Sequence, residues 1–125
     1  MNEKLPKVLK LKSNKQIETL FKVGKTIKAY PLILVYHEQP LEVDFKVGFS
    51  VSKRFFKKAV HRNFIKRLVR ENFRKKKYIF TVDEEQFLLM FLYVGKELPT
   101  YQNIEKSLLK IEGKWQKKIK RNDEA

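Results

Sequence analysis

The chain has 125 residues, 42% of them hydrophobic, and its 29 Lys and Arg against 14 Asp and Glu give a formal net charge of +15. This is the length of about one domain, with enough apolar residues for a packed core, so a disordered basic tail is excluded. The absence of cysteine excludes disulfides and cysteine-based zinc sites, while the charge attracts polyanions: nucleic acid or an anionic membrane surface.

The N-terminal segment, residues 1–12, is rich in lysine and contains Pro6, so we expect an extended or mobile basic arm. It lacks the apolar stretch of a signal peptide. The longest apolar run of the chain, residues 87–94, is well short of the ~20 residues that span a bilayer. We therefore expect a cytoplasmic protein with a single domain over residues 1–125 and a frayed tail at 120–125.

Residues 13–24 predict a short helix. Ser13, followed three residues later by Gln16, forms a capping box, and Gly24 can end the helix. Its apolar positions share one face: Ile17, Leu20 and Phe21. The next segment, residues 26–36, favours β-structure, although Pro31 excludes an uninterrupted central strand.

The later elements complete a mixed fold. Residues 43–52 alternate apolar and small polar side chains, as a strand does, and residues 86–94 are apolar throughout, as in a strand covered on both faces. Thr100 can cap a last helix with apolar residues three and four apart: Tyr101, Ile104, Leu108, Ile111 and Trp115. The order is α-β-β-α-β-α, or α-β-β-β-α-β-α if Pro31 splits the first β region. We expect an α+β sandwich with a small mixed four-stranded sheet and three helices.

Residues 59–77, AVHRNFIKRLVRENFRKKK, predict a helix with segregated charge. At about 100° per residue, its apolar residues fall in one half: Val60, Phe64, Ile65, Leu68 and Val69. Six polar residues fall in the other half, within about 140° of arc: Arg62, Asn63, Lys66, Arg67, Arg70 and Arg74. Phe73 falls among these, so either the helix is distorted or Phe73 packs against another element. The charge continues upstream into Lys53, Arg54, Lys57 and Lys58.

A basic helix face is most often ordinary solvated surface, but three features favour a polyanion partner here. Arginine predominates over lysine, and the planar guanidinium suits bidentate phosphate contacts. No acidic residue neutralises the row Arg62, Lys66 and Arg70 from an i+4 position. Since the sheet needs the apolar face, none is left to enter lipid, which favours nucleic acid.

Two other functional classes remain open at this point. An intrinsic enzyme is disfavoured, because His37 and His61 are isolated and the single carboxylate cluster, residues 83–85, lies at a turn. We expect no catalytic residue, metal or cofactor site in the protein itself. A ribosomal or other structural RNA-binding protein, or a DNA reader with a helix in a groove, is not excluded by the composition.

The strand end KVGFSVSKR and the following AVHRNFIKRLVRENFR resemble the bacterial ribonuclease P protein component. Its signature is a strand ending Gly-x-Ser-Val-Ser-Lys-Lys/Arg, then a helix with Arg-Asn-Arg-x-x-Lys-Arg-x-x-Arg. The resemblance covers roughly residues 7–119 in order, length and charge. Phe64 stands at the third position of the helix motif, where the family usually has an arginine, and we expect it to pack inward.

The resemblance implies the non-catalytic subunit of a ribonucleoprotein that removes the 5′ leader of precursor tRNA, with hydrolysis performed by the RNA and its own Mg²⁺. It implies a monomer, 1:1 with RNA, and a left-handed strand-helix-strand crossover. The positions that match the family's RNA contacts are Lys53, Arg54, Arg62, Asn63, Lys66, Arg67 and Arg70; Lys57, Lys58 and Arg74 extend the surface by charge. The implied leader cleft is formed by Ile17, Phe21, Val35 and Tyr36, with core packing as the alternative for Phe21.

Overall fold

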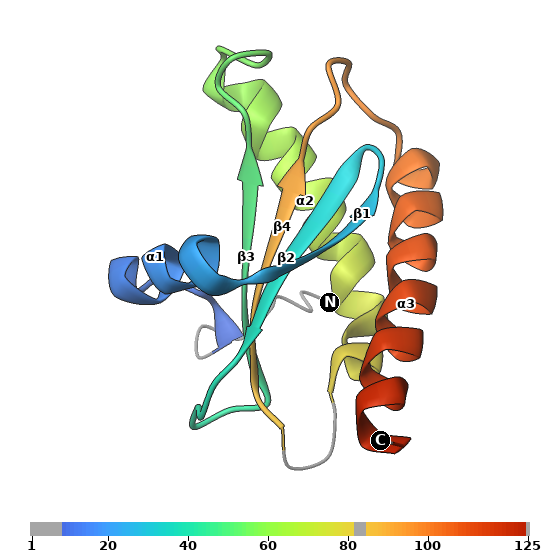
Figure 1. The fold of residues 1–125 in the computed structure, drawn as a ribbon. Coiled ribbons are helices and arrows are strands. Elements are labelled where there is room, and N and C mark those ends of the chain that lie inside the picture. Colours follow the sequence, from blue (N-terminus) through green and yellow to red (C-terminus); the bar gives the residue numbers. More distant parts are fainter. Residues whose placement is uncertain (1–8, 82–84, 125) are drawn as a thin grey trace.

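The computed structural model describes residues 9–81 and 85–124. The elements follow in the order α1 (Asn14–Val23), β1 (Lys25–Ala29), β2 (Leu32–Glu38), β3 (Phe45–Val51), α2 (Ala59–Lys76), a 3₁₀ turn η2 (Lys77–Phe80), β4 (Phe87–Tyr93) and α3 (Tyr101–Glu124). The expected α+β class and the four-stranded order are confirmed (Figure 1). No helix in the described part of the chain is long and apolar enough to cross a membrane.

Local sequence signals begin and end the helices. The Ser13 side chain accepts a hydrogen bond from the Gln16 main-chain N–H at 3.3 Å, and Gly24 ends α1 by donating to the Leu20 carbonyl at 2.8 Å. Thr100 and Asn103 cap α3 reciprocally, each side chain accepting from the other's N–H at 3.1 Å. The helix continues to Glu124, into the segment expected to fray.

Pro31 splits the first β region as expected, and β1 and β2 form an antiparallel hairpin around it. The sheet order is β1-β2-β4-β3, with β4 antiparallel to β2 and parallel to β3. In Figure 1, β3 and β4 both run upward, β4 lies to the right of β3, and α2 passes behind the sheet. The crossover is therefore left-handed, against the general rule.

The two faces of the sheet differ because side chains alternate along a strand. One face, under α2 and α3, carries the large core; Phe73 lies at its centre, fully buried, with ring centroids of Phe45, Phe80 and Phe91 at 5.4–5.5 Å. The other face carries a smaller cluster under α1, formed by Leu11, Leu20, Val35, Leu88 and Met90. Phe73 therefore packs against other elements, which was one of the two alternatives left open by the sequence.

Both outer strands of the sheet are partly covered along their free edges. The chain around Leu11 runs beside β3, where the Leu11 N–H donates to the Val47 carbonyl at 2.9 Å. The expected basic arm is therefore extended and bonded here, while its residues 1–8 lie outside the described part. Side chains of α3 cover β1: Ser107 donates to the Ala29 carbonyl, and Lys114 to the Lys28 carbonyl at 2.6 Å. Such covering prevents edge-to-edge pairing with other chains.

Candidate nucleic-acid interface

The helix α2 packs one face on the sheet and leaves the opposite face outward. Its buried residues are Ile65, Leu68, Val69, Asn72 and Phe73. The side opposite this stripe carries Asn63 and Arg67, both exposed, and Arg70 and Arg74, both half-buried. The segregation of charge predicted from the sequence is therefore present, although the boundary between the two faces lies further round the helix than expected, which places Phe73 inside.

Arg62 is the cation that this shift affects most. Its guanidinium turns back toward the preceding loop and donates to the main-chain carbonyls of Phe56 at 2.7 Å and Lys57 at 2.8 Å. Its predicted place beside the outward row is thus wrong: the side chain holds the end of the loop against the first turn of α2. Its charge stays at this end of the molecule, half-buried.

Two outward arginines lie over aromatic rings. The guanidinium carbon of Arg67 is 5.9 Å from the Phe64 ring centroid, and that of Arg70 is 5.7 Å from the Phe49 ring centroid. Phe64 is half-buried and packs against the large core, as expected from its angle. Contacts of this kind restrict the long side chains and present their charged groups from a defined position.

Val60 was predicted on the inward face of this helix, and that prediction is wrong. It is 66% exposed. In Figure 1 the first turns of α2 extend beyond the upper end of β3, so no sheet lies beneath them to cover an apolar side chain. The same overhang places the start of α2 next to the basic loop.

The loop of residues 52–58 joins β3 to α2 and carries the predicted upstream cations. Lys53, Arg54, Lys57 and Lys58 are exposed, whereas Phe56 is buried in the core and anchors the loop. The fold therefore brings these cations together with α2 at one end of the molecule (Figure 1).

Lys96, from the β4–α3 loop, joins this basic region and was missed by the sequence reasoning. Its ammonium and the guanidinium of Arg54 both lie 5.6 Å from the centroid of the Phe55 ring. Phe55 is partly exposed, so the two cations share one surface aromatic. No periodicity or motif connects residue 96 to residue 55; their proximity depends on the sheet order.

The expected leader-cleft residues divide between the two faces of the sheet. Ile17 and Val35 meet under α1 in the smaller cluster, and Phe21 is 54% exposed beside them on α1. Tyr36 does not join them, which corrects the prediction. It faces the large core, with its ring centroid 5.0 Å from that of Trp115, because neighbouring strand residues point to opposite faces.

No metal centre is found among the residues that the structure describes. In residues 9–81 and 85–124, no group of three or more His, Asp and Glu side chains could hold a metal ion. Of the carboxylate cluster considered from the sequence, Asp83 and Glu84 lie outside the described residues.

Comparisons with known proteins agree on one family. A model of the ribonuclease P family, described as "Ribonuclease P", matches residues 5–116. The ribonuclease P protein component of Porphyromonas gingivalis strain W83 is 34% identical over 111 residues, which cover 78% of this chain and 79% of the relative. The Staphylococcus aureus RNase P protein superposes with a TM-score of 0.69 at 27% identity, covering 82% of this chain and 91% of that chain. The Thermotoga maritima RNase P protein, solved with 1-(4-fluorophenyl)-2-thiourea, gives 0.66 at 25% identity, covering 80% and 94%.

Proposed function

The chain belongs to the ribonuclease P protein family and is a subunit of that tRNA-processing ribonucleoprotein; we propose that it holds the RNA through α2 and the basic loop while the RNA performs the chemistry. The observation that carries the proposal is the outward face of α2, where Asn63, Lys66, Arg67 and Arg70 lie beside the exposed cations of residues 53–58. Folded RNA is gripped through its backbone, which suits such a row of cations.

The side chains of the protein suit phosphate binding rather than hydrolysis. In the described residues no group of three or more His, Asp and Glu side chains is arranged to hold a metal ion, and we assign the metal and the hydrolysis of the phosphodiester to the RNA partner. The protein would neutralise phosphates that otherwise repel one another when the RNA and precursor tRNA come together. We expect one protein for each RNA and a location in the cytoplasm.

We assign the 5′ leader of precursor tRNA to the side of the sheet under α1. Phe21 offers an exposed ring there, supported by Leu20, which is fully buried beneath the helix. An exposed aromatic ring on a fixed helix can stack on an unpaired base. Because Ile17 and Val35 are aliphatic, they would contribute contact area rather than stacking.

The experiment that tests this function is reconstitution. Purified, RNA-free protein, the RNA subunit and a precursor tRNA are combined at low Mg²⁺, and the mature 5′ end is measured. We expect maturation when protein and RNA are both present, and no cleavage by the protein alone at any Mg²⁺ concentration. Maturation by RNA-free protein would overturn the assignment of chemistry to the RNA. Failure of the protein to stimulate the RNA at low Mg²⁺ would overturn the proposed role itself.

A further inference from the structure

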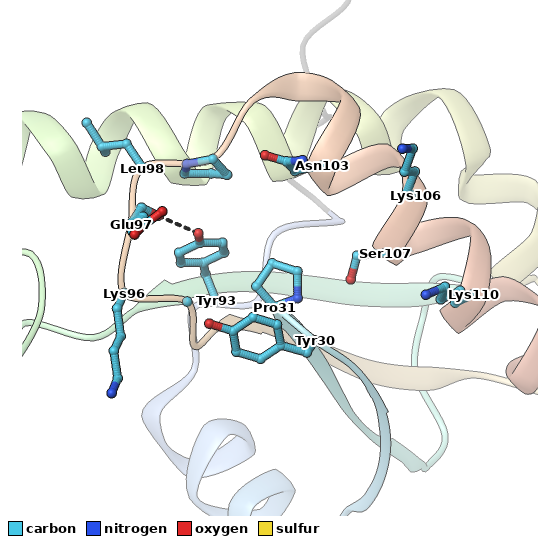
Figure 2. A pocket seen from close by; sticks show the side chains of 12 residues that line it. Tyr30, Pro31, Tyr93, Lys96, Glu97, Leu98, Asn103, Lys106, Ser107 and Lys110 are labelled. Carbon is cyan, nitrogen blue, oxygen red and sulfur yellow. Dashed lines mark hydrogen bonds between the residues drawn. The ribbon is translucent and has the colours of Figure 1, made fainter.

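A cavity of about 570 Å³ lies between the β1–β2 turn, the β4–α3 loop and the first turns of α3. Figure 2 shows its lining, which includes Tyr30, Pro31, Tyr93, Leu98, Asn103 and Ser107. Its volume falls within the roughly 300–1,000 Å³ of pockets that hold small organic groups. Neither α2 nor the cluster under α1 contributes a residue to it; of its lining residues, Lys96 also belongs to the basic region described above.

The walls of this cavity are fixed by hydrogen bonds within the protein. The Tyr93 hydroxyl donates to the Glu97 carbonyl at 2.6 Å, which closes the β4–α3 loop over the Tyr93 ring. Ser107 of α3 donates to the Ala29 carbonyl, and the Val94 N–H donates to the Pro31 carbonyl at 2.9 Å, which together hold the β1–β2 turn. The cavity is therefore built before any ligand arrives.

The charge at the cavity is positive. Lys106 and Lys110 come from one stripe of α3, Lys96 comes from the β4–α3 loop, and Glu97 is the acidic residue among the lining side chains. All three lysines are exposed, and such long side chains on flexible stems can turn toward an anion at the mouth; in Figure 2 the ammonium of Lys96 points away from the cavity, toward Phe55. A phosphate group is the anion that such a set of point charges suits.

An aromatic ring stands at the same mouth. Tyr30 is 73% exposed, more than any other exposed large hydrophobic side chain in residues 9–81 and 85–124, although the turn that carries it is held by the hydrogen bonds given above. Figure 2 shows its ring at the edge of the cavity. An exposed ring on a fixed turn, beside lysines, is the combination that binds an unpaired nucleotide, with the base stacked and the phosphates neutralised.

The cavity is continuous with the basic region. Lys96 lines the cavity and also lies over Phe55, which it shares with Arg54 of the basic loop. An RNA strand on the loop would therefore meet Lys96 before it reaches Tyr30. Because the loop belongs to the surface assigned to the RNA subunit, this continuity favours that RNA over precursor tRNA as the source of the nucleotide.

We propose that this cavity binds an unpaired nucleotide of the RNA subunit, with the base stacked on Tyr30 and the flanking phosphates on Lys96, Lys106 and Lys110. The proposal rests on the proposed function, since it adds a second contact to the same RNA. The test measures the affinity of full-length protein for the RNA subunit across a salt series, with thermal unfolding of each variant beside it. Tyr30→Ala should weaken binding several-fold to about a hundred-fold, while Tyr30→Phe should bind like the unmodified protein.

A charge-matched pair tests the lysines. Lys106→Ala should flatten the salt dependence by one phosphate contact, about 0.7–0.9 in the slope of log affinity against log salt, whereas Lys117→Ala, also an exposed lysine on α3, should not. Lys66→Ala tests the proposed function independently of the cavity, because Lys66 lies on α2 and does not line the cavity. If Lys66→Ala weakens binding while Tyr30→Ala and Lys106→Ala do not, the cavity proposal fails and the proposed function stands. If the unmodified protein does not bind the RNA subunit, the proposed function fails first.

A second readout identifies the source of the nucleotide. Leu98, partly exposed at the rim of the cavity, is replaced by photoreactive benzoylphenylalanine, and crosslinks are mapped in the assembled holoenzyme with precursor tRNA present. Crosslinks to one short unpaired stretch of the RNA subunit, lost in the Tyr30→Ala background, support the proposal. Crosslinks to precursor tRNA, or scattered over both RNAs, overturn it.

Discussion

Arg62 and Phe56 are joined by a hydrogen bond of 2.7 Å from the guanidinium to the main-chain carbonyl, and the same guanidinium donates to the next carbonyl, that of Lys57, at 2.8 Å. The first cation of the basic helix thereby fixes the end of the loop that carries four other cations. The charge of Arg62 bears on RNA binding and its two hydrogen bonds bear on stability, and variants can separate these two effects.

We expect Arg62→Ala to lower the free energy of unfolding by roughly 1–2 kcal/mol, which is the ~1.5–3 kcal/mol of a hydrogen bond to a charged group reduced because the side chain is half exposed. The affinity for RNA should fall by more than the loss of a single phosphate contact would cause, because the loop cations also lose their fixed position. Arg62→Lys should recover the charge without recovering both carbonyl bonds, because an ammonium lacks the planar fork of the guanidinium. Chemical denaturation and the salt dependence of RNA binding measure the two effects.

Lys66→Ala is the matched control on the same helix. It should leave stability within about 0.5 kcal/mol and flatten the salt slope by about 0.7–0.9, one contact's share. An unchanged slope would place Lys66 in solvent. Equal stability of Arg62→Ala and the unmodified protein would show that the loop does not depend on Arg62.

A second prediction concerns Glu112, a residue of α3 whose side chain is buried. One of its oxygens has no hydrogen-bond partner, and burial raises the pKa of this carboxyl, opposed in part by the charge of Lys76. The folded state therefore binds the proton more tightly than the unfolded chain does, so ionisation at neutral pH costs stability. Glu112→Gln keeps the size and removes the charge.

We expect Glu112→Gln to raise the free energy of unfolding at pH 7, on the order of 1 kcal/mol. The gain should shrink as the pH falls and vanish below the ordinary pKa of 4.5, where the carboxyl is protonated in both states. Denaturation curves of both proteins between pH 3 and 8 measure this, with Glu42→Gln, an exposed loop position, as the control. A variant that is less stable at pH 7 would mean that the Lys76 contact outweighs burial.

The sequence predicted the elements well because their signals are local. Ser13 and Thr100 cap helices by bonds to residues three positions away, and Pro31 interrupts a strand by lacking an N–H. The left-handed crossover was predicted from the family resemblance, because no local sequence pattern encodes it. Spacing also placed the charge of α2 on one side, since helical periodicity depends on nothing beyond the helix.

The errors on α2 arose because contacts with other elements decide which of its side chains are buried. The angles on α2 could not show where the sheet ends, so Val60 was assigned inward and Arg62 outward. The grouping of Tyr36 with Val35 is an error of another kind, because the alternation of side chains along a strand is a local rule that already places consecutive residues on opposite faces. The contact of Ser107 with the Ala29 carbonyl joins residues 78 positions apart, and the cavity beside it depends on that contact. No sequence pattern could have indicated it.

The last prediction concerns Phe21, for which the sequence left core packing and leader binding as alternatives. More than half of its side chain is exposed, while its neighbour Leu20 is fully buried. Phe21→Ala should therefore cost far less stability than the ~3–5 kcal/mol of a buried Phe→Ala change. Precursor tRNA binding by the holoenzyme should weaken by ~1–3 kcal/mol, the worth of one stacked base, while binding of mature tRNA and assembly with the RNA stay nearly unchanged.

Val23→Ala is the matched control for this change. Val23 also lies on α1 and is exposed to the same 54%, but it has no ring to stack on a base. It should leave the affinity for precursor tRNA unaffected, because its side chain cannot stack and lines a hollow with Tyr36 and Ile119, away from the cluster that holds Ile17. Equal losses for the two variants would point to general contact with α1. A large fall in melting temperature for Phe21→Ala, without selective loss of precursor tRNA, would make Phe21 a structural residue and leave the leader without its assigned aromatic contact.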